Sequence, residues 1–521
     1  MNTLYLSIVI VYVLVMLGIG FWCMRRTKSV GDFFLGGRSL GPWMSAFAYG
    51  TTYFSAVLFI GYAGRLGWGF GIHSLWIVVG NTLIGTFLAW MVLAGRTREM
   101  TARLSALTMP EFLRARYDSK PMQIISAIIV FVFLVPYSAS VYMGLSYLFE
   151  KTLGLQYNQA LIFLAALTGV YLMIGGYFAV AVSDFIRGIV EFAGVLVMVI
   201  LLTNMKGGMF STFSQLLDPK FMPALATPPP LAAGAMPPPG VSFPGWVVLA
   251  SLVFMTSFGP WALPQMVQKF YSIRAKADVR RAMIIATVFA FFMSFGAYYS
   301  GALTHLFFTD PKTSLAPIVD AATGKPNLDL LMPFFITTYV PQWLVMVILL
   351  MVFSASMSSL SSLVLVSSSA VAIDLYGALS GRERNQKRTM MLMRVLCGVF
   401  VALSLWIAMN KVDMIVNLMA IAWGSLSGAF LAPYLYGLFW KRTTRAGAFA
   451  GMISGVGTAV GLFFAWGKPS IPVAAAVAMI VPLIVVPLVS LLTKAPDPKL
   501  VARAFGEETS QPANAHPQAS S

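Results

Sequence analysis

The sequence predicts an all-α polytopic membrane protein. Of its 521 residues, 58% are hydrophobic and only 10% are charged, and the mean hydropathy is +0.81. Its apolar runs repeatedly exceed the roughly 18 residues that a bilayer-spanning helix needs. We therefore expect one transmembrane domain over residues 1–492 and a short tail after it.

The apolar runs predict thirteen spans. The first lacks the short apolar core and small-residue cleavage site of a signal peptide, so we interpret it as a span. In chain order the expected spans cover residues 3–23, 41–64, 72–94, 122–149, 158–175, 179–204, 244–268, 282–308, 333–372, 390–409, 412–438, 446–466 and 471–492. An odd number places the two termini on opposite sides of the membrane.

The basic residues predict which side is which. Of the 35 lysines and arginines, 25 fall in loops of one side, and these loops are 24–39, 95–120, 269–281, 382–388, 441–445 and 494–503. Only 8 fall in the loops of the other side. Basic loops stay in the cytoplasm, so we expect the N-terminus outside and the C-terminus inside. The net charge of +17 therefore requires no nucleic-acid partner.

Two outer loops and the C-terminal tail are long. Residues 205–243 contain TPPPLAAGAMPPPG, which predicts an irregular loop, and residues 309–332 carry Asp310, Asp320 and Asp329, which favour a gate or cap. Residues 493–521 end in EETSQPANAHPQASS and have too little apolar content to fold alone. We expect a disordered cytoplasmic tail there.

Two expected spans carry helix-breaking chemistry. Residues 50–55, GTTYFS, place glycine and β-branched residues at membrane depth, and SFGPWALPQ places Gly259, Pro260 and Pro264 within six residues. Freed backbone groups at that depth need protein, water or a ligand as partner. Breaks five spans apart are typical of inverted-repeat transporters with a midplane site, here with repeats of about 41–204 and 244–438. The alternative is a pair of packed, kinked helices.

Residues 354–362 read SASMSSLSS. On a helix, Ala355, Ser358, Ser359 and Ser362 share one face, which Ser361 adjoins. Small residues let helices approach closely, so packing alone explains this face. The functional alternative is sodium, a hard cation that hydroxyls and freed carbonyls can coordinate without several buried carboxylates.

Charged residues also fall inside the expected span over 179–204. Asp184, Arg187 and Glu191 follow one another at spacings of three and four. Intramembrane charges indicate function by default. Asp184 and Arg187 either neutralise each other, or Asp184 faces the serines and completes a second cation site or binds a proton.

Enzyme chemistry has no residues to support it. The sequence shows no nucleophile elbow, paired catalytic carboxylates, metal-spaced histidines or phosphate loop. The two cysteines, Cys23 and Cys397, each fall at or within a span, so a disulfide framework is not indicated. We expect no enzyme activity and no organic cofactor.

Six segments carry a family resemblance: GDFFLGGRSLGPW, LTMPEFLRARYDS, GVYLMIGGYFAVAVSDFIRG, LPQMVQKFYSIRAKADVRRA, SMSSLSSLVLVSSSAVAIDLYG and FWKRTTRAGAFAGMISGVG. Over residues 5–495 the chain resembles the sodium:solute symporter family, whose members carry proline, pantothenate, sugars, sialic acid and monocarboxylates. The resemblance implies a LeuT-type 5+5 inverted repeat with thirteen transmembrane helices. Residues 3–23, 446–466 and 471–492 would be extra helices outside the repeats.

The resemblance also implies ligand sets. The principal sodium site would use the carbonyls of Thr51, Phe54 and Ala355 and the hydroxyls of Ser358 and Ser359. A second sodium site, found in some members, would use Asp184, Ser358, Ser361 and Ser362, so one or two sodium ions are implied. The candidate solute-binding residues are Tyr53, Ser55, Tyr137, Thr256, Trp261 and Gln265.

The solute is indicated only as a class. Proline carriers have an aspartate at the position of Tyr53 and aromatic residues near Thr256 and Pro260, and this chain differs at all three. The segment TTYFSA looks closer to pantothenate or monocarboxylate carriers. We expect a small organic solute that bears a carboxylate: a monocarboxylate, pantothenate or an amino acid.

These observations predict a sodium-coupled symporter of the bacterial inner membrane, surrounded by lipid and able to transport as a monomer. One alternative is a proton-coupled symporter that uses Asp184. Another is a membrane sensor or channel on the same fold.

Overall fold

The computed structural model describes residues 3–24, 38–223, 225, 240–308, 316–319, 326–380 and 385–507; the side chains of 3–4, 20, 22–24, 171 and 173–179 lie outside that description. The expected proline-rich stretch, Asp310 and Asp320 also lie outside it. Over the described residues the structure is helical, and the β pairing consists of the isolated bridges Leu40 to Ile273 and Val319 to Pro326. The all-α prediction is confirmed.

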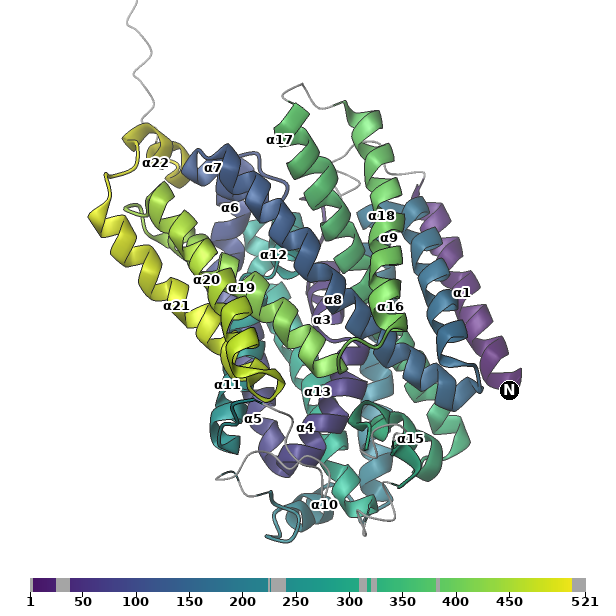
Figure 1. The fold of residues 1–521 in the computed structure, drawn as a ribbon. Helices are drawn as coiled ribbons and strands as arrows, with labels where there is room; N and C mark the ends of the chain where they lie inside the picture. Colours follow the sequence, from purple (N-terminus) through teal and green to yellow (C-terminus); the bar gives the residue numbers. More distant parts are fainter. Residues whose placement is uncertain are drawn as a thin grey trace, which may run out of the picture.

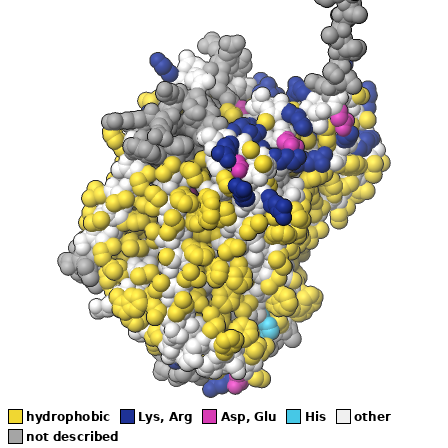
Figure 2. All heavy atoms as spheres, turned by 180° about the vertical axis from the view of Figure 1, so that it is seen from behind, with side chains coloured by type: hydrophobic (Ala, Val, Ile, Leu, Met, Phe, Trp, Pro, Cys, Tyr) yellow, Lys and Arg dark blue, Asp and Glu magenta, His cyan; other side chains and the backbone are white. Residues whose placement is uncertain are grey.

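The helices form a bundle (Figure 1). Helices α6, α7, α17 and α22 lie at the upper end, whereas α10, α15 and the N-terminus lie at the lower end. On the face in Figure 2, lysine and arginine gather at the upper end above a broad hydrophobic surface. We call this upper end the basic end. The first described residues and α22 therefore lie at opposite ends of the molecule.

The long helices share an apolar composition and 22 or more residues. They are α1 Thr3–Met24, α8 Lys120–Leu153, α9 Tyr157–Asn204, α13 Val279–Phe307, α16 Gln342–Ser369, α18 Gln386–Met409, α19 Ile415–Phe439, α20 Arg445–Trp466 and α21 Ile471–Leu492. Caps fix several starts: the Thr444 side chain accepts the Gly447 amide, and the Ser119 side chain accepts the Met122 amide.

Shorter helices connect or interrupt these. The α-helices are α3 Pro42–Tyr53, α4 Ala63–Phe70, α5 Leu75–Val79, α6 Gly95–Arg103, α7 Met109–Tyr117, α10 Met209–Leu216, α11 Gly245–Phe258, α12 Pro264–Ser272, α15 Leu331–Tyr339, α17 Tyr376–Ser380 and α22 Pro498–Phe505. The π-helices are η2 Val57–Tyr62, η4 Gly80–Leu88, η5 Trp90–Ala94 and η10 Ala370–Leu375. The 3₁₀-helices are η3 Gly71–Ser74, η6 Gly259–Trp261, η7 Lys276–Asp278, η8 Ala316–Ile318, η9 Leu328–Leu330 and η11 Lys468–Ser470.

Within the described residues, 9 helices are long and apolar enough to cross a membrane, or 10 if the bent pair of α11 and α12 is one span. Shorter apolar helices, such as Tyr5–Ile19 and Tyr157–Val170, fall outside that number. The chain is therefore a polytopic membrane protein, and the total of thirteen spans stays a prediction.

Both expected breaks are confirmed. Helix α3 ends at Tyr53, and Phe54 is extended before the chain resumes as η2 and α4. Helix α11 ends at Phe258 and passes through η6 before α12 begins, with a bend of 40°. The proline chemistry explains the second break, because Pro260 and Pro264 have no amide hydrogen to donate.

Helix α9 replaces the two expected spans over 158–175 and 179–204 by one continuous helical element. Thr168 donates to the sulfur of Met357, and Ser358 donates to Asp184. Thr168 and Asp184 are 16 positions apart, so a straight helix would separate them by about 24 Å. Because both contact adjacent residues of α16, the two arms of α9 pack against the same part of that helix.

Close packing positions the first broken helix. At Gly301 of α13, a side chain would collide with the carbonyl of Ala63 in α4, so only glycine allows these helices to approach so closely. Gly67 of α4 likewise faces the backbone of Gly301. The half of the broken span that follows Phe54 is therefore held firmly against α13.

The expectation of disorder over 493–521 is wrong for its first part. Helix α22 forms because Asp497 caps it and accepts the Lys499 amide. Ala504 is buried, and the Phe505 ring lies beneath the guanidinium groups of Arg96 and Arg116. These contacts supply the apolar burial that composition alone did not indicate. Residues 508–521 lie outside the described residues.

Candidate functional site

The break after α3 frees backbone carbonyls at the centre of the bundle. The last four carbonyls of any helix have no following helical amide to accept. Phe54 still donates its amide to the Gly50 carbonyl at 3.0 Å. The carbonyls of Thr51 and Thr52 follow, and both accept from the Ser359 hydroxyl, each at 3.2 Å. A side chain of α16 therefore replaces the missing amides.

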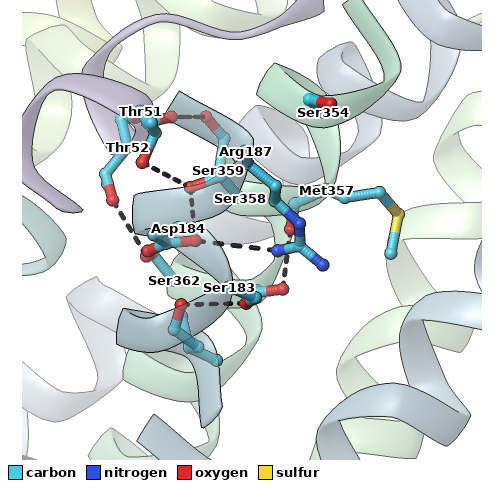
Figure 3. Close-up of polar contacts among 12 residues, drawn as sticks. Thr51, Thr52, Ser183, Asp184, Arg187, Ser354, Met357, Ser358, Ser359 and Ser362 are labelled. Atoms are coloured by element: carbon cyan, nitrogen blue, oxygen red, sulfur yellow. Dashed lines mark hydrogen bonds and ion pairs between the residues drawn. The ribbon is translucent and has the colours of Figure 1, made fainter. Parts of the chain in front are cut away.

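The serine row of α16 faces this break. All residues from 351 to 369 are buried. The Ser358 hydroxyl lies 2.7 Å from the Thr51 hydroxyl and 2.7 Å from Oδ1 of Asp184. Figure 3 shows that Thr51 and Thr52 of α3 and Asp184 of α9 converge on one small volume with Ser358, Ser359 and Ser362 of α16. Three helices thus meet through oxygen atoms.

Three of the five principal ligand candidates are joined by direct contacts. Thr51, Ser358 and Ser359 are joined by the contacts above, and Phe54 is the extended residue that ends α3. Ala355 lies buried in α16 one turn before Ser359. Backbone carbonyls and neutral hydroxyls of this kind suit a hard monovalent cation. Within the described chain, no three His, Cys, Asp or Glu side chains come together as a metal cluster.

Asp184 belongs to the same group and is fully buried. Its Oδ1 accepts from Ser358 and lies 3.6 Å from a guanidinium nitrogen of Arg187, which is 1% exposed. Glu191 is also buried, one turn beyond Arg187 on α9. Asp184 therefore pairs with Arg187 and also faces the serine row (Figure 3), and its role in binding a second cation or a proton stays a prediction.

The candidates for the second sodium site do not all meet. Ser361 donates to the carbonyl of Met357 in its own helix at 2.6 Å, so its hydroxyl is turned away from the break. Ser362 lies 3.0 Å from the Thr52 hydroxyl. Ser362 also accepts a hydrogen bond of 3.0 Å from the ammonium of Lys269.

Lys269 is a residue that the sequence interpretation misplaced. We expected it in the basic loop 269–281, but it lies within α12 and is 0% exposed. Its position after the expected span made it resemble a loop cation. Gln268 and Lys269 follow Gln265 at spacings of three and four residues, which places all three on one face of a helix. This pattern could have indicated a buried polar surface.

The two broken helices meet at the candidate solute site. Tyr53 Oη, at the end of α3, donates to the Thr256 carbonyl of α11 at 2.5 Å. Ser427 of α19 donates to the Gly259 carbonyl at 3.3 Å, so a side chain again satisfies a freed backbone group. Beside these contacts lies a cavity of about 20 Å³, enough for a water molecule but too small for an organic solute.

Three of the predicted solute residues, Tyr53, Ser55 and Thr256, line this cavity. Tyr137 does not line the cavity but lies beside Trp423, which does, with the two ring centroids 6.0 Å apart. Trp261 instead donates to the Ile84 carbonyl, and Gln265 lies buried in α12 away from the lining. The lining residues that sequence reasoning missed are Phe54, Val57, Leu58, Tyr62, Asn81, Tyr298, Met419 and Trp423.

Several buried polar atoms in the cavity lining and in α12 lack a hydrogen-bond partner within the described part of the chain. Tyr62 Oη, Asn81 Oδ1 and both amide atoms of Gln265 are buried without a hydrogen-bond partner among the described residues. Buried polar atoms are normally paired, so such atoms indicate groups that a bound molecule or water satisfies.

A separate charged group lies at the end opposite the basic end. Asp329, in η9, is 2% exposed and accepts the Ile415 amide at 3.0 Å, where α19 begins. Burial raises the pKa of its carboxyl to about 6. Asp413 pairs with Lys468 at 3.2 Å nearby. Asp329 thus caps a helix of the bundle from the loop in which a gate or cap was expected.

Comparison with known proteins gives a consistent result. The model of the Sodium:solute symporter family matches residues 33–455. The chain is 31% identical over 454 residues to the sodium/proline symporter of Escherichia coli (strain K12), which covers 86% of each chain. It is 30% identical over 474 residues to the sodium/proline symporter of Staphylococcus aureus (strain bovine RF122 / ET3-1), covering 88% of this chain and 85% of that one.

Solved structures share the architecture. A substrate-bound, outward-open Na⁺-coupled sialic acid symporter, described as revealing a novel Na⁺ site, matches with a TM-score of 0.74 at 18% identity, covering 95% of this chain and 98% of that chain. A nucleobase-cation-symport-1 family transporter in a closed conformation with bromovinylhydantoin bound matches with a TM-score of 0.50 at 13% identity. The match covers 91% of this chain and 98% of that chain. These likenesses show a LeuT-type fold.

Proposed function

The chain belongs to the sodium:solute symporter family, and from this premise we propose that it imports a small carboxylate-bearing solute by coupling its entry to sodium. It is a transporter and not an enzyme, as are its relatives and structural neighbours. The observation that carries the sodium assignment is the contact of Ser359 with the freed carbonyls of Thr51 and Thr52.

For the principal sodium ion we propose the carbonyls of Thr51, Phe54 and Ala355 and the hydroxyls of Ser358 and Ser359. The Ser359 hydroxyl now donates to backbone carbonyls. With sodium present, the same oxygens would turn their lone pairs to the ion. Neutral ligands allow release, because they bind a monovalent cation less tightly than several carboxylates would.

The proposed mechanism follows from where these ligands lie. Sodium would tie α16 to the broken end of α3, and Tyr53 at that end contacts α11 across the solute cavity. Binding of sodium would therefore organise one wall of the solute site. A single charge that moves inward through 100 mV contributes about 2.3 kcal/mol, which is nearly two decades of concentration ratio.

For the solute we propose contacts with Tyr53, Ser55 and Thr256, with Tyr137 and Gln265 as neighbours in an opened cavity. No lysine or arginine lines the described cavity. A carboxylate there would instead lie at the positive end of the helix that starts after Ser55, whose first amides now bond to Ser55. Monocarboxylates, pantothenate and amino acids fit this requirement, and proline belongs to the set because relatives are sodium/proline symporters.

The proposed orientation places the basic end in the cytoplasm of a bacterial plasma membrane and the N-terminus outside. The proposed repeats are residues 41–204 and 244–438, each opened by a broken helix. Residues 3–23, 446–466 and 471–492 would be additional helices, and a monomer would suffice for transport. The termini of the described chain lie at opposite ends of the bundle, which supports this arrangement (Figure 1).

Thermal stabilisation of the purified protein tests the function. Lactate, pantothenate, proline, glucose and sialic acid would each be added in sodium chloride or in potassium chloride. We expect one carboxylate class to raise the melting temperature in sodium only. Stabilisation that ignores sodium and follows pH would contradict sodium coupling and favour proton coupling through Asp184. Ion currents through reconstituted protein without any solute would indicate a channel.

A further inference from the structure

The ammonium of Lys269 contacts Ser362, a member of the second candidate sodium set. Lys269 is 0% exposed and donates to Ser362 Oγ at 3.0 Å. The same oxygen lies 3.0 Å from the Thr52 hydroxyl. Ser362 therefore links α12, α16 and α3. Its hydroxyl oxygen already accepts a hydrogen bond from the positively charged ammonium of Lys269.

The carboxylate of this site also faces a fixed cation. Asp184 is the acid that would attract a second sodium ion, and Arg187 lies 3.6 Å from it. Glu191 stands one turn further along α9 and is buried as well. Arg187 and Lys269 both interact electrostatically with Asp184 before any ion enters. The negative charge that would attract a second sodium ion is therefore already countered by cations of the protein.

The remaining ligands of the second set are also occupied. Ser358 donates to Asp184, and Ser361 donates to Met357 within α16. A sodium ion on Ser362 would share an oxygen with an ammonium group, and two like charges at that separation repel strongly in a buried site. The principal set differs, because its hydroxyl of Ser359 contacts backbone carbonyls instead of charged groups.

We propose that Lys269 is a built-in cation that occupies the second sodium position, so that this symporter binds a single sodium ion. The proposal rests on the sodium-coupled function above and determines its ion stoichiometry. Lys269 is a specificity-determining residue: it fixes the number of bound ions by holding Ser362 and by repelling a cation near Asp184. It also links α12, on one side of the second break, to the helix that carries the principal site.

Equilibrium binding of ²²Na⁺ to the purified full chain in lipid nanodiscs tests this proposal without a known solute. We expect the wild-type protein to bind a single sodium ion. Lys269→Gln, which keeps a donor to Ser362 but removes the charge, should bind a second ion. Lys269→Arg keeps the charge and should bind only one. Adding Asp184→Asn to Lys269→Gln should remove the second ion again.

The outcomes separate the two claims. No saturable sodium binding by the wild type would contradict the sodium-coupled function itself. Two ions bound by the wild type would overturn the role of Lys269 and leave sodium coupling intact. A folded Lys269→Gln protein that still binds a single ion would also overturn it. If that variant does not fold, two ions bound by the wild type or by Lys269→Arg would still overturn the role of Lys269.

Discussion

The two ends of one serine row differ in what faces them. Ser358 and Ser359 meet the freed end of α3, and the Ser359 hydroxyl contacts the backbone carbonyls of Thr51 and Thr52. One turn on, Ser361 is bonded within its own helix and Ser362 holds the ammonium of Lys269. The comparison teaches that a hydroxyl-rich helix can serve as a cation site only where no fixed cation of the protein already occupies its oxygen atoms.

The largest expected effect comes from removing the cation beside Asp184. Arg187→Met would leave a buried carboxylate with one positive partner fewer, and breaking such a pair costs about 3–5 kcal/mol. We expect a fall in the melting temperature of the purified protein. Arg281→Met, at an exposed arginine of α13, is the matched control and should change little. Equal melting temperatures for the two variants would show that the Asp184 end of the row does not depend on this charge.

A second variant perturbs the principal end from outside it. A side chain at Gly188 of α9 would collide with Phe47 and press on the methyl group of Thr51. Gly188→Ala should cost about 1–3 kcal/mol, the usual cost of overpacking, and should weaken sodium binding by displacing the Thr51 carbonyl. Gly169→Ala, on the same helix with open space around it, is the control. Unchanged sodium binding in Gly188→Ala would mean that the position of Thr51 is not critical.

A smaller effect concerns a buried carboxyl far from the row. The pKa of Asp329 is raised to about 6 by burial, above its ordinary value of 3.8. Its raised pKa favours the folded state fully below pH 3.8, and this contribution is lost as pH rises through 6. Between pH 5 and 7 the free energy of unfolding of the wild type should fall by about 1 kcal/mol relative to that of Asp329→Asn. Parallel melting curves for the two proteins across that range would contradict the assignment.

Local chain chemistry made part of this structure predictable. Prolines at 260 and 264 and the glycine and threonines before Phe54 marked both breaks, because each limits the helix through its own backbone. The spacing of Ser358 and Ser359 placed them on one face for the same local reason. Such features depend on neighbours in sequence and are visible without a fold.

The rest depended on tertiary contacts. Lys269 looked like a loop cation because it follows an apolar run, and only the packing of α12 against α16 buries it. Asn81, Tyr298 and Trp423 come from three separate elements that no sequence pattern brings together. The hydroxyl of Ser361 could turn to the row or to its own helix, and the structure shows the second arrangement.

The most direct test of the central claim is sodium binding by Ser359→Ala beside Ser361→Ala. The two variants remove the same hydroxyl from one helix, two residues apart. A lost contact to a charged group costs about 1.5–3 kcal/mol, so Ser359→Ala should raise the sodium concentration for half-saturation about tenfold or more. Ser361→Ala should leave it unchanged. Equal sodium dependence in wild type and Ser359→Ala would contradict the site at the break of α3.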